Sequence, residues 1–166
     1  MAPDDPVSSV SVVFTIGHGR DDFGAFTERC RPHGVRTIVD VRSAPYSRHA
    51  PDFTKARLER LCAEAGLGYR WMGATLGGRP DGVEGNAGLA AGSAPADPDS
   101  AGFAAGISEL EGLIHAGPVV VLCAETDPER CHRAHIIAPA LIERGHRVAH
   151  ITADGTVASH QPQLEL

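Results

Sequence analysis

The sequence contains no apolar run that approaches the roughly 20 residues required for a membrane-spanning helix. Its first nine residues are acidic, so we expect no signal peptide there. Two phosphate-binding glycine motifs are also missing: Gly-x4-Gly-Lys-Ser/Thr occurs nowhere, and no Gly-x-Gly-x-x-Gly follows the first apolar segment. These absences argue against a membrane protein, a P-loop nucleotide hydrolase and a dinucleotide-binding enzyme.

Positive charge is scarce as well. Lys55 is the single lysine, and 15 basic against 21 acidic residues give a net charge of −6. Broad, sequence-independent binding to nucleic acid requires a basic surface, so this charge balance argues against it. A small pocket lined by arginine remains compatible with these numbers.

Cysteines are too few for a disulfide-rich scaffold, since only four occur in 166 residues. We expect all four to be reduced thiols in a cytoplasmic protein. Cys30 and Cys62 fall on the apolar faces of predicted helices and fit best as small core residues. Cys123 and Cys131 belong to a stretch with more chemistry in it.

The hydrophobic pattern alternates between strands and helices in the order β-α-β-α-β-loop-α-β-α-β. This order predicts a three-layer, Rossmann-like α/β fold whose mostly parallel five-stranded sheet carries helices on both faces. We expect residues 1–166 to form one domain, with flexible tails and a mobile Gly/Ala/Pro-rich loop. The expected strands are residues 10–16, 37–41, 67–72, 119–123 and 147–151; the tails are 1–8 and 157–166, and the loop is 81–102.

The stretch from Val119 to Arg133 contains the densest chemistry in the chain. Its first five residues read as a buried parallel strand that ends at Cys123. Asp127 followed by Pro128 predicts the start of a helix. The triplet after it, residues 131–133, would then lie in the first helical turns, where anions bind and cysteine pKa values tend to fall.

Ligands of parallel sheets bind beyond the carboxyl ends of the strands. The polar segments of this chain follow the predicted strands at that edge. We therefore expect one site made from residues distant in sequence, namely His18 and Arg20, then Arg42, Ser43, Tyr46 and Arg48, then Arg79, and finally Cys123, Glu125, Cys131, His132 and Arg133.

Five separated pieces together resemble domain-of-unknown-function family 488. They are residues 15–18, 39–48, 76–78, 123–133 and 150–155. The resemblance spans roughly residues 12–155 and implies a cytoplasmic protein of a bacterial or archaeal family, without implying a reaction. Gly19 and Arg20 stand where the family usually has serine and another polar residue, so a serine hydroxyl is not expected to act there. His135 is not part of the family pattern and is not counted as a candidate.

We assign candidate roles by residue chemistry. Cys131 is the expected nucleophile, with Cys123 more simply a core residue. Proton transfer falls to His132, Glu125 or His18. Arginine side chains bind phosphate and carboxylate through paired N–H groups, so an anionic, phosphate-bearing substrate related to nucleotides is expected. The expected substrate-binding residues are Arg42, Ser43, Tyr46, Arg48, Arg79 and Arg133.

Two alternatives stay open. The side chains of His18, Cys123, Glu125, Cys131 and His132 are plausible ligands for zinc or iron, although their spacing matches no zinc ribbon. The second alternative is a non-catalytic module that binds a nucleotide with the same arginine side chains. The residues define no cofactor, they predict neither a membrane nor a nucleic-acid partner, and they leave a homodimer open.

Overall fold

A six-stranded sheet with the order β3-β2-β4-β1-β5-β6 forms the centre of the protein. The structure, a computed structural model, describes residues 11–78 and 97–160. The first five strands in chain order are parallel, and β6 pairs antiparallel with β5. The predicted Rossmann-like α/β architecture is confirmed.

The helices and strands follow the predicted alternation. Asp22 caps α1 by accepting the backbone N–H of Ala25 at 2.8 Å, and Ser100 caps α4 by accepting that of Phe103 at 3.1 Å. The elements are β1 (Val12–Gly17), α1 (Phe23–Cys30), η1 (Arg31–His33), β2 (Thr37–Asp40), η2 (Pro51–Phe53), α2 (Lys55–Glu64), β3 (Gly68–Trp71), α3 (Gly73–Leu76), α4 (Ala101–Ala116), β4 (Val119–Cys123), η3 (Pro128–Arg130), η4 (Arg133–Ile137), α5 (Ala138–Glu143), β5 (Arg147–Ile151) and β6 (Val157–Ser159).

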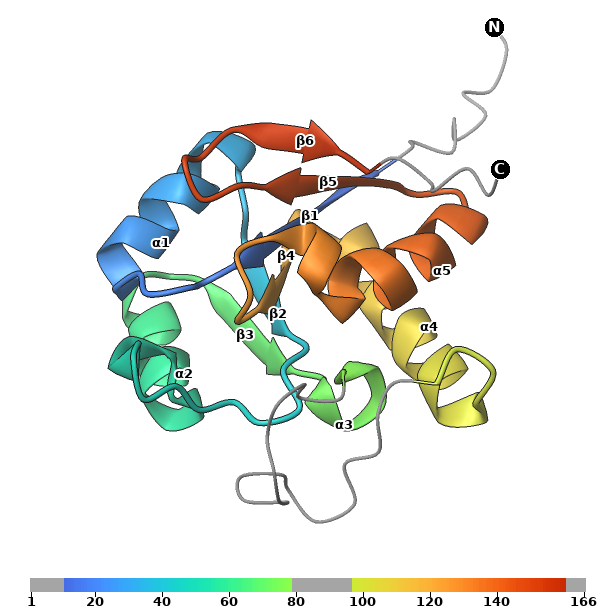
Figure 1. Cartoon of the computed structure of the whole chain (residues 1–166), viewed down its shortest axis with the longest axis horizontal. Coiled ribbons are helices and arrows are strands. Elements are labelled where there is room, and N and C mark those ends of the chain that lie inside the picture. Colours follow the sequence, from blue (N-terminus) through green and yellow to red (C-terminus); the bar gives the residue numbers. More distant parts are fainter. Residues whose placement is uncertain (1–10, 79–96, 161–166) are drawn as a thin grey trace, which may run out of the picture.

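Each face of the sheet has its own hydrophobic core, because α1 and α2 cover one face while α4 and α5 cover the other (Figure 1). Val120 and Leu122 of β4 point into the core under α1 and α2, whereas Val119 and Val121 point into the core under α4 and α5. This alternation explains why β4 reads as a continuous apolar run: all five of its residues are buried.

Three local expectations need correction. Val157–Ser159 form β6 beside β5, where the sequence predicts part of a flexible tail. The helix expected after Pro128 is only a 3₁₀ turn, followed by extended backbone at Cys131 and a five-residue π-helical segment before α5. The predicted mobile loop at 81–102 falls largely outside the described residues, and its last two residues, 101 and 102, already belong to α4.

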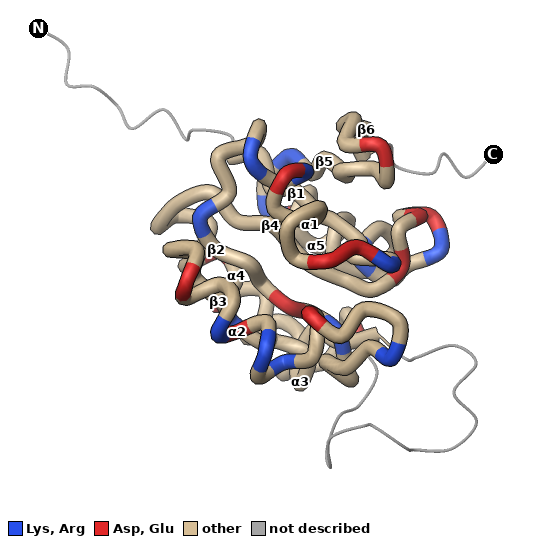
Figure 2. The backbone as a smooth tube through the Cα atoms, turned by 90° about the vertical axis from the view of Figure 1, so that its left-hand side faces the viewer, with Lys and Arg blue, Asp and Glu red and all other residues tan. Residues whose placement is uncertain are grey.

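Basic and acidic residues are mixed along the described chain. Figure 2 shows Lys and Arg interspersed with Asp and Glu along the tube, and the basic residues do not gather on the side facing the viewer. None of the helices in the described part of the chain is long and apolar enough to cross a membrane. The cytoplasmic location and the homodimer stay predictions.

Candidate functional site at the carboxyl edge of the sheet

Three neighbouring strands bring the candidate residues together. Gly17, the last residue of β1, lies opposite Cys123 of β4, and Asp40 of β2 lies opposite Leu122. His18 continues from β1 and donates its backbone N–H to the carbonyl of Cys123 at 2.9 Å. The loops after β1 and β2 therefore flank the end of β4, as the rule for parallel sheets predicts.

A thiol–imidazole cluster lies at this edge. The cluster consists of Cys123 at the end of β4 and of Cys131 and His132 before η4. One possible ligand atom from each of these side chains lies within 4.8 Å of the other two. The Nδ1 atom of His132 lies 3.8 Å from the sulfur of Cys123 and 3.7 Å from that of Cys131. Both cysteine side chains are buried, at 8% and 5% exposure, while His132 is half-buried.

The two thiols have opposite acidities. The hydrogen bond donated by Cys131 lowers the pKa of Cys123 to about 7 against the opposing effect of burial, helped by the charge of Arg133 and the backbone N–H groups of Ala124 and Glu125. The pKa of Cys131 is raised to about 12, because Cys131 donates this hydrogen bond and because its side chain is buried. Cys123 is therefore the more acidic thiol of the pair.

The sequence predicts Cys131 as the nucleophile and Cys123 as a core residue; Cys123 is indeed buried, and the catalytic roles stay predictions, with the lower pKa of Cys123 favouring it as the more nucleophilic sulfur. Cys131 has extended backbone, φ −131° and ψ 144°, and is not in the first turn of a helix. The backbone N–H groups that lower the pKa of a cysteine belong to Ala124 and Glu125, in the loop directly after β4, and they act on Cys123. The sequence signal for Cys123 was its position at the end of the central strand.

Arg133 is fully buried and all of its guanidinium nitrogens are engaged inside the protein. Nε donates to the hydroxyl of Thr15 at 3.1 Å, Nη2 donates to the carbonyl of Thr126 at 3.0 Å, and Nη1 donates to the carbonyl of Glu125. This side chain ties the loop after β4 to β1. The predicted contact of Arg133 with a substrate stays a prediction.

The guanidinium of Arg42 is also engaged by groups of the protein. Its guanidinium pairs with both carboxylate oxygens of Asp40, at 2.8 and 2.7 Å, and Tyr69 donates to the same carboxylate at 2.6 Å. The remaining nitrogen, Nη1, lies 3.3 Å from Nε2 of His18. Arg42 is still close enough to interact electrostatically with Cys123.

His18 is a neutral acceptor in this arrangement. Its Nδ1 faces the carbonyl of Gly19 at 2.9 Å, which leaves Nε2 to accept from Arg42. Burial and the positive charge of Arg42 lower the pKa of His18 to about 4. A histidine with this pKa is uncharged at neutral pH, and its predicted part in proton transfer stays a prediction.

The other sequence candidates are not among the three side chains of this cluster. Ser43 is buried and donates its hydroxyl to the carbonyl of Gly78, and a Cβ at Gly78 would be 2.6 Å from Nδ1 of His132. Glu125 is exposed, and its carboxylate accepts the backbone N–H of Asp127 at 3.1 Å. Arg20, Tyr46 and Arg48 are exposed, and Arg79 lies outside the described residues.

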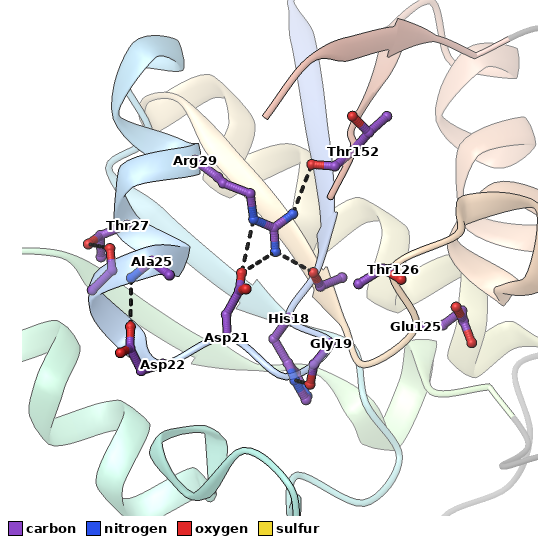
Figure 3. A network of polar contacts seen from close by, with 12 residues as sticks. His18, Gly19, Asp21, Asp22, Ala25, Thr27, Arg29, Glu125, Thr126 and Thr152 are labelled. Atoms are coloured by element: carbon purple, nitrogen blue, oxygen red, sulfur yellow. Dashed lines mark hydrogen bonds and ion pairs between the residues drawn. The ribbon is translucent and has the colours of Figure 1, made fainter. Parts of the chain in front are cut away.

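The sequence analysis did not identify Arg29, which contacts the loop after β1. Arg29 reaches from α1 toward the end of the sheet, as Figure 3 shows, and donates to Asp21, to the carbonyl of Thr152 and to the carbonyl of Gly17. The side chain is 10% exposed. It connects the loop after β1 to the end of β5. The one sequence feature that indicated such a contact is the position of Arg29 in the last turn of α1.

Replacing Cys131 with alanine should raise the pKa of Cys123, because the variant removes the donor with the largest effect on that thiolate. A hydrogen bond to a charged group contributes about 1.5–3 kcal/mol, which corresponds to a rise of about 1–2 pH units. The ultraviolet absorbance of the thiolate as a function of pH measures it. The matched variant Cys62→Ala should leave the titration in place, and an unchanged profile in Cys131→Ala would contradict the assignment.

The fold and this cluster define the class: a doubly wound α/β protein with a buried cysteine pair and a histidine at the carboxyl edge of its sheet. The chain belongs to the family described as "Domain of unknown function DUF488", whose model matches residues 22–139. That range covers α1 through the start of α5 and includes both cysteines of the cluster. No curated protein and no solved structure matches the chain.

Proposed function

We propose that the protein is a thiol-dependent enzyme in which Cys123 attacks a small anionic substrate, with phosphate-bearing compounds of the nucleotide type as the first class to test. The observation that supports this best is the position of Cys123 at the end of the central strand, where its sulfur lies 3.8 Å from Nδ1 of His132 and its pKa is lowered. The thiol of Cys131 and the backbone N–H groups of Ala124 and Glu125 all favour the charged form of Cys123. Such donors also stabilise negative charge that develops during group transfer.

An anionic substrate is favoured by the surrounding charge. Arg133 and Arg42 both interact electrostatically with Cys123, although their N–H groups are largely engaged by the protein. The substrate would therefore be held by backbone N–H groups and the local positive field, and less by an arginine clamp than the sequence predicts. Arg48, exposed on the loop after β2, stays a candidate for contacting a larger substrate.

In the proposed step, the Cys123 thiolate forms a bond to the electrophilic atom of the substrate while the bond to the leaving group breaks. For a phosphate ester the new bond is S–P and the broken bond is P–O, whose electron pair stays with the leaving oxygen. His132 is the group positioned to supply a proton to that oxygen, since it lies beside both sulfurs. Water then attacks the phosphorus and forms a new P–O bond, the S–P bond breaks with its electron pair returning to the sulfur of Cys123, and His132 takes the proton of the water that replaces the one it gave up.

Alkylation of the intact protein tests the nucleophile. Near pH 7, iodoacetate and iodoacetamide should label Cys123 faster than the other three cysteines, because burial keeps the pKa of Cys30 and Cys62 at about 12 and Cys131 is likewise protonated. The ratio of the iodoacetate rate to the iodoacetamide rate should be higher for Cys123 than for free cysteine, because iodoacetate is an anion. Peptide mass spectrometry identifies the labelled residue.

Nucleoside monophosphates and inorganic phosphate serve as competing ligands in the same assay. Protection of Cys123 identifies the substrate class, and turnover lost in Cys123→Ser but kept in Cys62→Ala completes the test. Protection without any turnover would favour the non-catalytic binding module instead. Labelling of Cys123 no faster than that of Cys30 would remove the proposed nucleophile.

A further inference from the structure

The cluster of Cys123, Cys131 and His132 also has the donor set of a metal site. Two thiol sulfurs and one imidazole nitrogen come from the end of β4 and from the short segment before η4, and they lie within 4.8 Å of one another. We propose that these three side chains bind one soft divalent ion, with zinc as the preferred metal, and leave a fourth coordination position open. Nothing in the family description assigns such a site.

The distances match the coordination geometry. Zinc binds sulfur at about 2.3 Å and imidazole nitrogen at about 2.0–2.1 Å, so a tetrahedral arrangement separates a sulfur from the nitrogen by about 3.6 Å. Here the two sulfur–nitrogen separations are 3.8 and 3.7 Å. One nitrogen atom, Nδ1 of His132, lies near both sulfurs, and all three atoms lie within 4.8 Å of one another, so both sulfur–nitrogen separations already fit one shared metal ion.

The surroundings favour a soft metal and hold the ligands in place. Thiolate and imidazole ligands select zinc, copper(I) or iron, and calcium and magnesium prefer oxygen. Two thiolates neutralise a divalent ion, which suits sulfurs that are buried at 8% and 5% exposure. Gly78 lies so close to the ring of His132 that a Cβ there would be 2.6 Å from Nδ1, and this contact restricts the ring.

Three protein ligands with an open fourth position are typical of catalytic and transiently occupied zinc sites, whereas structural sites have four. The proposed ion uses the sulfur of Cys123. A loaded site therefore withdraws this thiolate from nucleophilic attack, and the metal site does not depend on the proposed enzyme function being correct.

Cobalt(II) provides the direct test. The full chain, purified without a polyhistidine tag and kept reduced, should bind one equivalent of cobalt with a sulfur-to-metal charge-transfer band and the intense visible bands of tetrahedral coordination. Zinc should displace the cobalt. The variants Cys123→Ser, Cys131→Ser and His132→Ala should each weaken binding by more than about 10-fold, and Cys62→Ala, which changes a thiol outside the cluster, should bind like the wild type.

A second measurement avoids variants that fail to fold. In the wild-type protein, zinc should slow alkylation of Cys123 and Cys131 and leave that of Cys30 unchanged, and it should raise the thermal unfolding midpoint by linkage. Absence of the charge-transfer band, or equal labelling with and without zinc, overturns the metal site. Labelling of Cys123 in the presence of a chelator tests the proposed nucleophile separately, so either proposal can fail alone.

Discussion

Replacing Gly17 with alanine should destabilise the protein by about 3 kcal/mol or more, because the new methyl group collides with backbone. A Cβ at Gly17 would be 1.8 Å from the carbonyl oxygen of Glu125 and 2.7 Å from the Cα of Thr126. These atoms belong to the loop that follows β4, which is itself fixed by Arg133. The loop must move away from β1, and urea unfolding measures the loss.

The same substitution at Gly112 is the matched control. Gly112 is exposed in α4, and a Cβ there meets nothing within 4 Å. Alanine in place of glycine within a helix stabilises by about 0.5–1 kcal/mol, so Gly112→Ala should increase stability while Gly17→Ala decreases it. Neither glycine has a positive φ, so the opposite signs isolate the collision. Equal effects of the two substitutions would show that the loop gives way freely.

Replacing Arg133 with methionine should cost about 3–5 kcal/mol of unfolding free energy. The variant keeps much of the side-chain length but leaves three acceptors without their donor: the hydroxyl of Thr15 and the carbonyls of Glu125 and Thr126. The pKa of Cys123 should also rise, because the charge of Arg133 contributes to lowering it. Chemical denaturation and the thiolate titration measure the two effects.

Arg70 provides the comparison for this experiment. It is half-exposed and pairs with Glu109 at 3.0 Å on the surface. Exposed ion pairs contribute roughly 0–1 kcal/mol, so Arg70→Met should change stability little and should leave the Cys123 titration unaltered. If Arg133→Met were as stable as Arg70→Met, the buried guanidinium would not be what fixes the loop.

The alternation of strands and helices, and the edge of the sheet where the site forms, followed from the sequence. Ile137 and Leu141 share a helical line with Arg133, and this line correctly indicated that Arg133 points inward. Its burial was predictable but its partners were not, because Thr15 is 118 positions away in the chain. The substrate role assigned to Arg133 stays a prediction, because each of its three guanidinium nitrogens already donates to a protein acceptor.

The relative acidity of the two cysteines was beyond sequence reasoning. A helix start at Asp127 correctly indicated a capped turn, since its carboxylate accepts the N–H of Glu129 at 3.0 Å. The turn ends before Cys131, however, and the backbone there is extended, with the sulfur of Cys131 in one cluster with that of Cys123. The pKa of each sulfur depends on which one donates, and donation depends on distances of a few tenths of an ångström.

The sequence by itself determined the order of elements, the two-sided burial of the sheet and the edge at which reactive side chains meet, because periodicity and chain direction are local properties. Only the tertiary structure decided which of those side chains remain available. Hydrogen-bond partners and desolvation depend on residues brought together from distant segments. They engage the polar groups of Arg42, Arg133 and His18 inside the protein, and they make Cys123 the more acidic sulfur.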